Sequence, residues 1–370
     1  MAIEILRGGI CMSASGDEYD VLFVLPMPTT KIVGGYKMVY EYANYLSRKG
    51  KKVCIVYNGY RGENSKNLPK LPIYCTRVLI GKFGPKWFSL DKKVSRKVIK
   101  NFDEKRIPHS KIIVATTAES AVFVNALKYK YQKKIYFIQG FENWTLTTDE
   151  LYETYRYNMI KVVVSKWLYD EVKKHCQDDL YYIPNGIDHK VFSINIDRKK
   201  RKKHTIAVLY HYDEQKGCDV SLNVIKQIKK QYHDLDVYAF GSPKRPNEWE
   251  DWIHYSHNAS PEIVSECMNQ SSIFLCTSRQ EGYGLTGLES IFCGCILVTT
   301  DTKGVHEYAT QSNSCICSID DESALVDAVC KVFDNDDFAE ELFLNCDDIR
   351  NSYDVEVSKK KFFELAFKNT

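Results

Sequence analysis

The fold of this chain can be inferred from one glycine-rich stretch, Ser278-Arg279-Gln280-Glu281-Gly282-Tyr283-Gly284-Leu285-Thr286-Gly287-Leu288-Glu289. A β-like apolar run, Ile273–Cys276, precedes the stretch, and an apolar segment of helical period follows it. The stretch therefore predicts a turn that leads from a strand into a helix. The N-terminus of such a helix favours an anion, because its first N–H groups have no partners and its dipole is positive there.

Two glutamates flank this predicted anion site. Glu281 lies beside the turn, and Glu289 falls about two helical turns further along. Glycines at 282 and 284 let a bulky ligand approach the main chain. Since carboxylates accept hydrogen bonds from hydroxyl groups, the stretch predicts a site for a polyhydroxylated phosphate ester.

The two glutamates, the small-residue turn and the Cys293-Gly294-Cys295 that follows resemble the E-x7-E signature of retaining nucleotide-sugar glycosyltransferases of the GT-B fold, glycosyltransferase family four. The spacing is informative because it is set between a strand and a helix. The resemblance covers most of the chain from about Val21. It implies an α/β fold with two Rossmann-like domains facing each other across a cleft. It also implies transfer of a hexose-type sugar from a nucleoside diphosphate to a glycan, a lipid-linked saccharide or another hydroxyl acceptor.

The resemblance also implies roles for individual residues. Glu281 would position the transferred sugar, and Glu289 would bind the ribose of the donor. Lys216 would grip the donor diphosphate together with His211, which stands where relatives often have arginine. Lys216, Glu281 and Glu142 are the candidates for catalysis. The candidate donor-binding residues are Gly34, Gly35, His211, Lys216, Gly241, Arg279, Glu281, Gly282, Tyr283, Gly284, Leu285 and Glu289.

The chemistry of sugar transfer explains why a cation is expected here. Departure of the nucleoside diphosphate leaves negative charge on its phosphates, which fixed cations and helix-end N–H groups stabilise. Lys216 and the glycine turns would supply this charge, so we expect no metal and no other cofactor, with a donor of the UDP or GDP type. The sequences Asp234-Leu-Asp236 and Asp334-Asn-Asp336 are interpreted as capping or solvated acids.

The first half of the chain reads as alternating strands and helices. A strand at Val21–Leu25, the pair Gly34-Gly35 and a strand at 52–57 predict a βαβ unit. The pair lacks the full dinucleotide pattern, so an oxidoreductase is not indicated, and a tight turn without ligand is its alternative. Glu142 follows the strand 134–138 at its carboxyl end, where open α/β sheets bind ligands. It is a candidate for the acceptor or sugar side, and a solvated loop acid is the alternative.

Length and composition suit two domains. The net charge is +3 and 27% of the residues are charged, so neither disorder nor a general affinity for polyanions is indicated. We expect an acceptor-side domain at 1–192, a basic linker at 193–204 and a donor-binding domain at 205–350, with a last helix, about 353–370, packing back on the first domain. The basic run Arg198–His204 is interpreted as a solvated linker, with contact to anionic lipid as an alternative. Nucleic acid is not expected, because no aromatic platform accompanies the run.

No apolar run reaches the roughly 18 residues needed to cross a bilayer, and the N-terminus lacks a secretory signal. The 13 cysteines are an odd number scattered through apolar segments, which favours reduced thiols. We therefore expect a cytoplasmic protein, with peripheral membrane contact as an open alternative. Two other functions stay open: a GT-B epimerase or phosphorylase, and a non-catalytic binding module that kept the fold.

Overall fold

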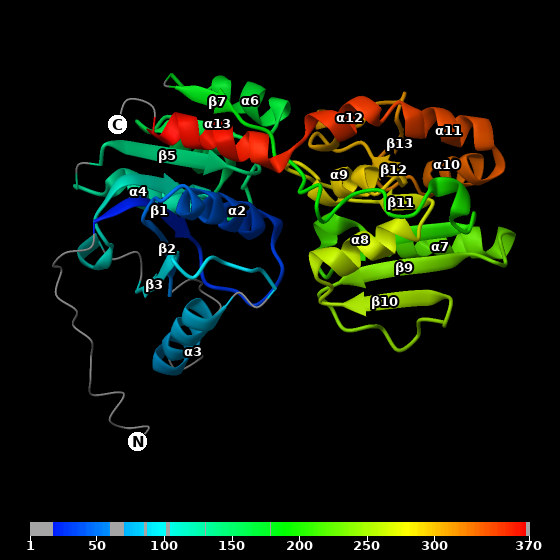
Figure 1. The fold of residues 1–370 in the computed structure, drawn as a ribbon, viewed down its shortest axis with the longest axis horizontal. Coiled ribbons are helices and arrows are strands. Elements are labelled where there is room, and N and C mark those ends of the chain that lie inside the picture. Colours follow the sequence, from blue (N-terminus) through cyan, green and yellow to red (C-terminus); the bar gives the residue numbers. More distant parts are fainter. Residues whose placement is uncertain are drawn as a thin grey trace.

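The computed structural model describes residues 18–59, 70–84, 87–100, 104–129, 131–177 and 179–367. The first 17 residues and residues 368–370, which the predicted domain limits include, lie outside this part. Two parallel sheets with helices packed against them form two bodies that lie side by side (Figure 1). The predicted α/β architecture of two Rossmann-like domains is confirmed.

The first sheet has seven strands in the order β3-β2-β1-β4-β5-β6-β7. The strands are β1 Tyr19–Leu25, β2 Val53–Asn58, β3 Ser95–Ile99, β4 Ser110–Ala115, β5 Lys133–Ile138, β6 Ile160–Val163 and β7 Leu180–Tyr182. The helices are α2 Gly34–Arg48, α3 Lys70–Phe83, α4 Ala118–Ala126, α5 Thr148–Tyr155 and α6 Lys166–Lys173. The strand order reverses between β1 and β4, and in such sheets ligands bind outside the carboxyl ends of the strands at this point.

The second sheet has six strands in the order β10-β9-β8-β11-β12-β13. The strands are β8 Thr205–Tyr210, β9 Asp236–Gly241, β10 Ile253–His257, β11 Ile273–Cys276, β12 Ile296–Thr300 and β13 Ser314–Cys317. The helices are α7 Cys218–Gln231, α8 Pro261–Asn269, α9 Leu285–Phe292, α10 Glu322–Asp334, α11 Asp336–Leu344 and α12 Asp347–Ser352. The reversal lies between β8 and β11, the strand that leads into the glycine-rich stretch.

The last helix, α13 (Val355–Phe367), lies on the first domain, where Figure 1 shows it in red. Phe362 is fully buried and packs its ring against Phe23 of β1 and Tyr42 of α2. The buried Lys359 forms an ion pair with Glu41 of α2 at 2.7 Å. The chain thus crosses between the domains twice, and an isolated bridge joins Ile187 to Asp354 at the crossing.

The basic run before β8 is bound to the second domain, so its interpretation as a solvated linker was wrong for its central arginine. Arg201 is only 8% exposed and donates to the carbonyl oxygens of Ile196, Met268, Ser271 and Cys293. Three chain segments, at Ile196, Met268–Ser271 and Cys293, therefore converge on one guanidinium, because buried carbonyls need donors. Burial lowers the pKa of Arg201, yet a guanidinium keeps its charge at neutral pH.

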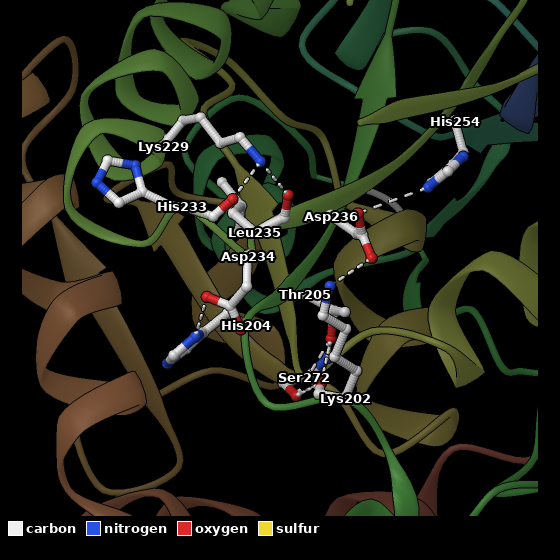
Figure 2. A network of polar contacts seen from close by, with 10 residues as sticks. All are labelled: Lys202, His204, Thr205, Lys229, His233, Asp234, Leu235, Asp236, His254 and Ser272. Atoms are coloured by element: carbon white, nitrogen blue, oxygen red, sulfur yellow. Dashed lines mark hydrogen bonds and ion pairs between the residues drawn. The ribbon is translucent and has the colours of Figure 1, made fainter. Parts of the chain in front are cut away.

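The residues around Arg201 in the basic run form ion pairs with acids of the same domain. The Lys202 ammonium lies 2.7 Å from Asp236, and His204 Nδ1 forms a hydrogen bond with Asp234 at 2.8 Å; Figure 2 shows both contacts. Both acids belong to the first Asp-x-Asp sequence, and they pair here with basic side chains. Lys199 and Lys200 are exposed, and contact of this run with anionic lipid stays a prediction.

None of the helices in the described part of the chain combines the length and the apolar character needed to span a bilayer.

Candidate functional site

A short 3₁₀ turn, Glu214–Lys216, brings Lys216 to the glycine-rich stretch. Asp213 caps the turn by accepting from the N–H of Gln215, and Gly217 ends it in the left-handed conformation, with φ of 58°. A Cβ at Gly217 would overlap the carbonyl oxygen of Thr277, so only glycine lets the turn lie against the end of β11. Local backbone geometry thus fixes the base of Lys216.

Lys216 and Glu281 form an ion pair. The Lys216 ammonium donates to Glu281 Oε1 at 2.8 Å, and Ser278 Oγ donates to the same oxygen at 2.7 Å. Burial alone would lower the pKa of the Lys216 amine, but the Glu281 carboxylate outweighs it and raises that pKa. The lysine is therefore a permanent cation at neutral pH, with 27% of its side chain still exposed.

The predicted turn into a helix is present, and α9 begins at Leu285. Gly284 precedes it with φ of 82°, and its carbonyl oxygen accepts from the Tyr308 hydroxyl at 2.5 Å. The Leu285 side chain lies 3.6 Å from the Cβ position of Gly34, at the start of α2 in the first domain. The N-termini of two helices from different domains therefore meet at the glycine-rich stretch, and both favour an anion.

Glu289 lies where the two domains touch. Its carboxylate is 7% exposed and accepts from the ammonium of Lys37, one turn into α2, at 2.6 Å. The same ammonium lies 4.9 Å from the centre of the Phe192 ring. Sequence reasoning missed Lys37, because nothing local links it to a partner 252 residues away.

Three other predicted donor-binding residues, His211, Gly241 and Arg279, belong to the second domain. His211 Nδ1 accepts from the N–H of Asp213 at 3.0 Å, and burial lowers the pKa of the imidazole. Gly241 ends β9, and a Cβ there would overlap the carbonyl oxygen of Tyr210. Arg279 is committed within its own domain, because it binds Asp219 at 2.7 Å and Asp320 at 2.8 Å. Those two acids raise the pKa of Arg279.

Glu142 is a buried residue, so the alternative of a solvated loop acid was wrong. Its Oε2 accepts from the N–H of Ala118 at 2.6 Å, at the N-terminus of α4. A carboxylate is stabilised there by the helix dipole. This hydrogen bond joins the loop after β5 to the start of α4 within the first domain.

The glycine-rich stretch also contacts the first domain directly through Gly282. Its carbonyl oxygen accepts from Trp167 Nε1 at 2.9 Å and from Ser165 Oγ at 3.2 Å. A Cβ on Gly282 would lie 2.5 Å from the carbonyl oxygen of Gln139, so glycine is needed for this approach. The neighbouring Tyr283 is buried and donates to the carbonyl oxygen of Asn185 at 2.7 Å.

The structure thus brings Gly34, Lys216, Glu281, Gly282 and Glu289 to one place between the domains. Elsewhere, two shallow hollows of about 460 and 280 Å³ lie at the β6–β7 edge of the first domain. Among the described residues, no cluster of three or more His, Cys, Asp or Glu side chains could hold a metal ion. The cysteines of that part are free thiols.

Residues 203–335 match a protein family described as Glycosyl transferases group 1. The chain is 22% identical over 174 residues to a 2-deoxystreptamine N-acetyl-D-glucosaminyltransferase from Niallia circulans, a stretch that covers 44% of this chain and 45% of that protein. The chain spans less than half the length of the curated relatives it matches.

Solved structures match over nearly the whole chain. Sucrose-phosphate synthase from Thermosynechococcus elongatus superposes with a TM-score of 0.73 and 12% identity, covering 95% of this chain and 99% of that one. The Anabaena protein Alr3699/HepE in complex with UDP and glucose gives a TM-score of 0.71 and 12% identity, covering 94% and 99%. The predicted fold is confirmed: the chain has the GT-B fold, and residues 203–335 of its second domain are similar to the glycosyl transferases group 1 family.

Proposed function

We propose that the protein is a retaining glycosyltransferase that moves a hexose-type sugar from a UDP- or GDP-sugar to a hydroxyl of a glycan, a lipid-linked saccharide or another acceptor. One observation carries the proposal: a fixed cation, two acids and two helix N-termini converge between two Rossmann-like domains. The family match over residues 203–335 and the glycosyltransferase among the relatives support it. One matched protein of this fold was solved with UDP and glucose.

In this proposal each group has a task. The bond between sugar C1 and the diphosphate oxygen breaks, and the electron pair stays on the diphosphate. Lys216 and the N-terminus of α9 stabilise that charge without reorganising, because both are fixed by contacts within the domain. The Glu281 carboxylate, which already accepts hydrogen bonds from Ser278 and Lys216, also accepts hydrogen bonds from hydroxyls of the transferred sugar. The Glu289 carboxylate accepts hydrogen bonds from the ribose hydroxyls.

The acceptor hydroxyl then forms the new bond to C1 on the face that the diphosphate leaves. Its proton goes to an oxygen of the departing diphosphate, so the reaction needs no protein base. Glu142, which is bound to the N-terminus of α4, acts on the position of its loop in this scheme. We propose that transfer proceeds without a metal ion, since Lys216 and the helix ends supply positive charge.

Donor binding is tested by ligand-induced thermal stabilisation with a panel of UDP- and GDP-sugars. We expect at least one sugar nucleotide to stabilise the protein. Lys216→Met should weaken its binding about 100-fold, and Glu289→Gln should weaken it about tenfold. Lys230→Met, which removes an exposed cation of α7, is the matched control and should bind as the unmodified protein does. Full affinity in both site variants would contradict the assignment.

Transfer itself is tested with the donor that binds. Release of free nucleotide that requires an added acceptor distinguishes transfer from epimerisation, and sugar phosphate formed from inorganic phosphate would indicate a phosphorylase. ¹H NMR of the first product gives the anomeric configuration. Inversion, or loss of activity in EDTA that returns with a divalent cation, would refute the retaining or the metal-independent part of the proposal.

A further inference from the structure

An exposed indole stands beside the contact between the domains. Trp144, in the loop after β5, is 67% exposed. Burying an aromatic side chain of this size on a ligand would gain about 2 kcal/mol. The loop that carries it follows the end of β5, the strand whose carboxyl end contacts the glycine-rich stretch through Gln139.

One small residue separates this indole from the proposed catalytic turn. The Cβ position of Gly140 lies 3.7 Å from Trp144 Cη2 and 4.0 Å from the Cα of Gly282. Gly282 is the neighbour of Glu281, the acid assigned to the transferred sugar. An acceptor that packs on the indole would therefore lie next to the proposed position of the transferred sugar.

The loop is held so that the indole keeps its place. The buried Glu142 carboxylate binds the N–H of Ala118, and the Glu142 carbonyl oxygen accepts from Thr145 Oγ1 at 3.3 Å. On the far side, Thr147 and Glu150 form a capping box that starts α5. Such anchoring lowers the conformational entropy lost on binding.

We propose that Trp144 is a platform for the acceptor and that the acceptor group bound there is a saccharide ring. One face of a pyranose ring exposes C–H groups, which pack on an indole face, while its hydroxyls stay hydrated or reach polar neighbours. The proposal rests on the proposed function, because it places the acceptor beside the sugar donor. It narrows the acceptor to one whose accepting or adjacent unit is a sugar.

Acceptor kinetics test the platform. Methyl hexosides, maltose, cellobiose and lactose serve as saccharide acceptors, and glycerol serves as an acceptor without a ring. Trp144→Ala should raise the KM for a saccharide about tenfold and leave the donor KM and the slow hydrolysis of the donor unchanged. Trp144→Phe, which keeps a smaller ring, should fall between. Phe83→Ala removes an equally exposed aromatic side chain, 66% exposed, from α3, and it should change nothing.

Saturation-transfer NMR with the same saccharides, without donor, gives a readout independent of catalysis. The unmodified protein should bind them, and Trp144→Ala should lose the signal. An unchanged saccharide KM in Trp144→Ala would overturn the platform and leave the proposed function intact, as would transfer to glycerol but to no saccharide. Trp144-dependent saccharide binding by a protein that binds no sugar nucleotide would refute the proposed function alone.

Discussion

The two domains contribute different material to the site. Within the second domain Lys216 is paired with Glu281, and Arg279 is paired with Asp219. The first domain contributes a cation that reaches the second domain, because the Lys37 ammonium pairs with Glu289. The charge arrangement of the second domain is therefore set by its own fold, whereas the contribution of the first depends on how the two bodies are placed.

This contrast predicts that the largest effect on stability comes from within the second domain. Arg201→Met should destabilise that domain by about 4 kcal/mol, because it removes the buried donor that carbonyl oxygens of three chain segments share. Urea unfolding followed by intrinsic fluorescence measures the loss. Lys200→Met, which changes the exposed neighbour, should stay within about 0.5 kcal/mol. Equal effects of the two variants would restore the interpretation of a solvated linker.

The contact between the domains should influence rate more than stability. Gly282→Ala puts a methyl group 2.5 Å from the Gln139 carbonyl oxygen, which is a backbone atom, so the backbone at this contact between the domains must shift. We expect donor turnover to fall about 30-fold, since misplacement by about 1 Å is enough for such a loss. Gly140→Ala adds a methyl group at the same junction in ordinary contact, at 3.7 Å, and should stay within about threefold. A fall as large in Gly140→Ala would show that the junction tolerates no added volume.

A smaller effect is expected from the ion pair that spans the domains. Lys37→Met leaves the Glu289 carboxylate without its cation, and we expect donor affinity to fall about tenfold. Lys37→Arg keeps the charge and should recover most of the affinity, although a guanidinium fits the site of an ammonium imperfectly. Lys37→Met combined with Glu289→Gln should lose less than the two separate losses added together, because the pair acts as one unit. Strict additivity of the two losses would mean that the pair is incidental.

Lys37, which the sequence did not predict, contrasts with the features that a local pattern does reveal. Strands such as β1 and β11 were predicted because their side chains are buried on both faces and read as continuous apolar runs. The edge strands β3 and β10 were missed because they are half-exposed and carry residues such as Arg96 and His254. The glycine-rich turn before α9 was also predicted, because its glycines stand directly between an apolar strand and an apolar helix in the sequence.

Which polar side chains are already paired or buried within the fold could not be predicted from local patterns. Arg279 was placed among the donor-binding residues, yet its guanidinium is held by two acids from other segments, Asp219 in the first turn of α7 and Asp320 in the loop before α10. A solvated position was the alternative for Glu142 and the interpretation for the run that contains Arg201, and each of the two side chains is buried against backbone groups of another segment. Such pairings depend on the tertiary fold, and no local pattern encodes them.

The smallest predicted effect concerns His211, whose protonation should lower the stability of the fold and raise the affinity for the donor. Burial lowers the pKa of His211, so the folded protein resists protonation and this residue contributes stability above the unfolded pKa of about 6.5. That contribution is lost as pH falls from 6.5 through the lowered pKa. The phosphates of a bound sugar nucleotide favour the protonated imidazole. Donor affinity should therefore rise about threefold as the pH falls over the same range.

Stability and donor affinity should therefore change in opposite directions as the solution is acidified from pH 7.5 to 5.5, and His211→Gln should flatten both curves. Thermal unfolding with and without a UDP-sugar measures them together. A sugar nucleotide suits the test, because its diphosphate does not titrate in this range. If His211→Gln flattened the stability curve alone, the imidazole would be a structural part of the second domain, and the diphosphate would depend on Lys216 and the helix ends.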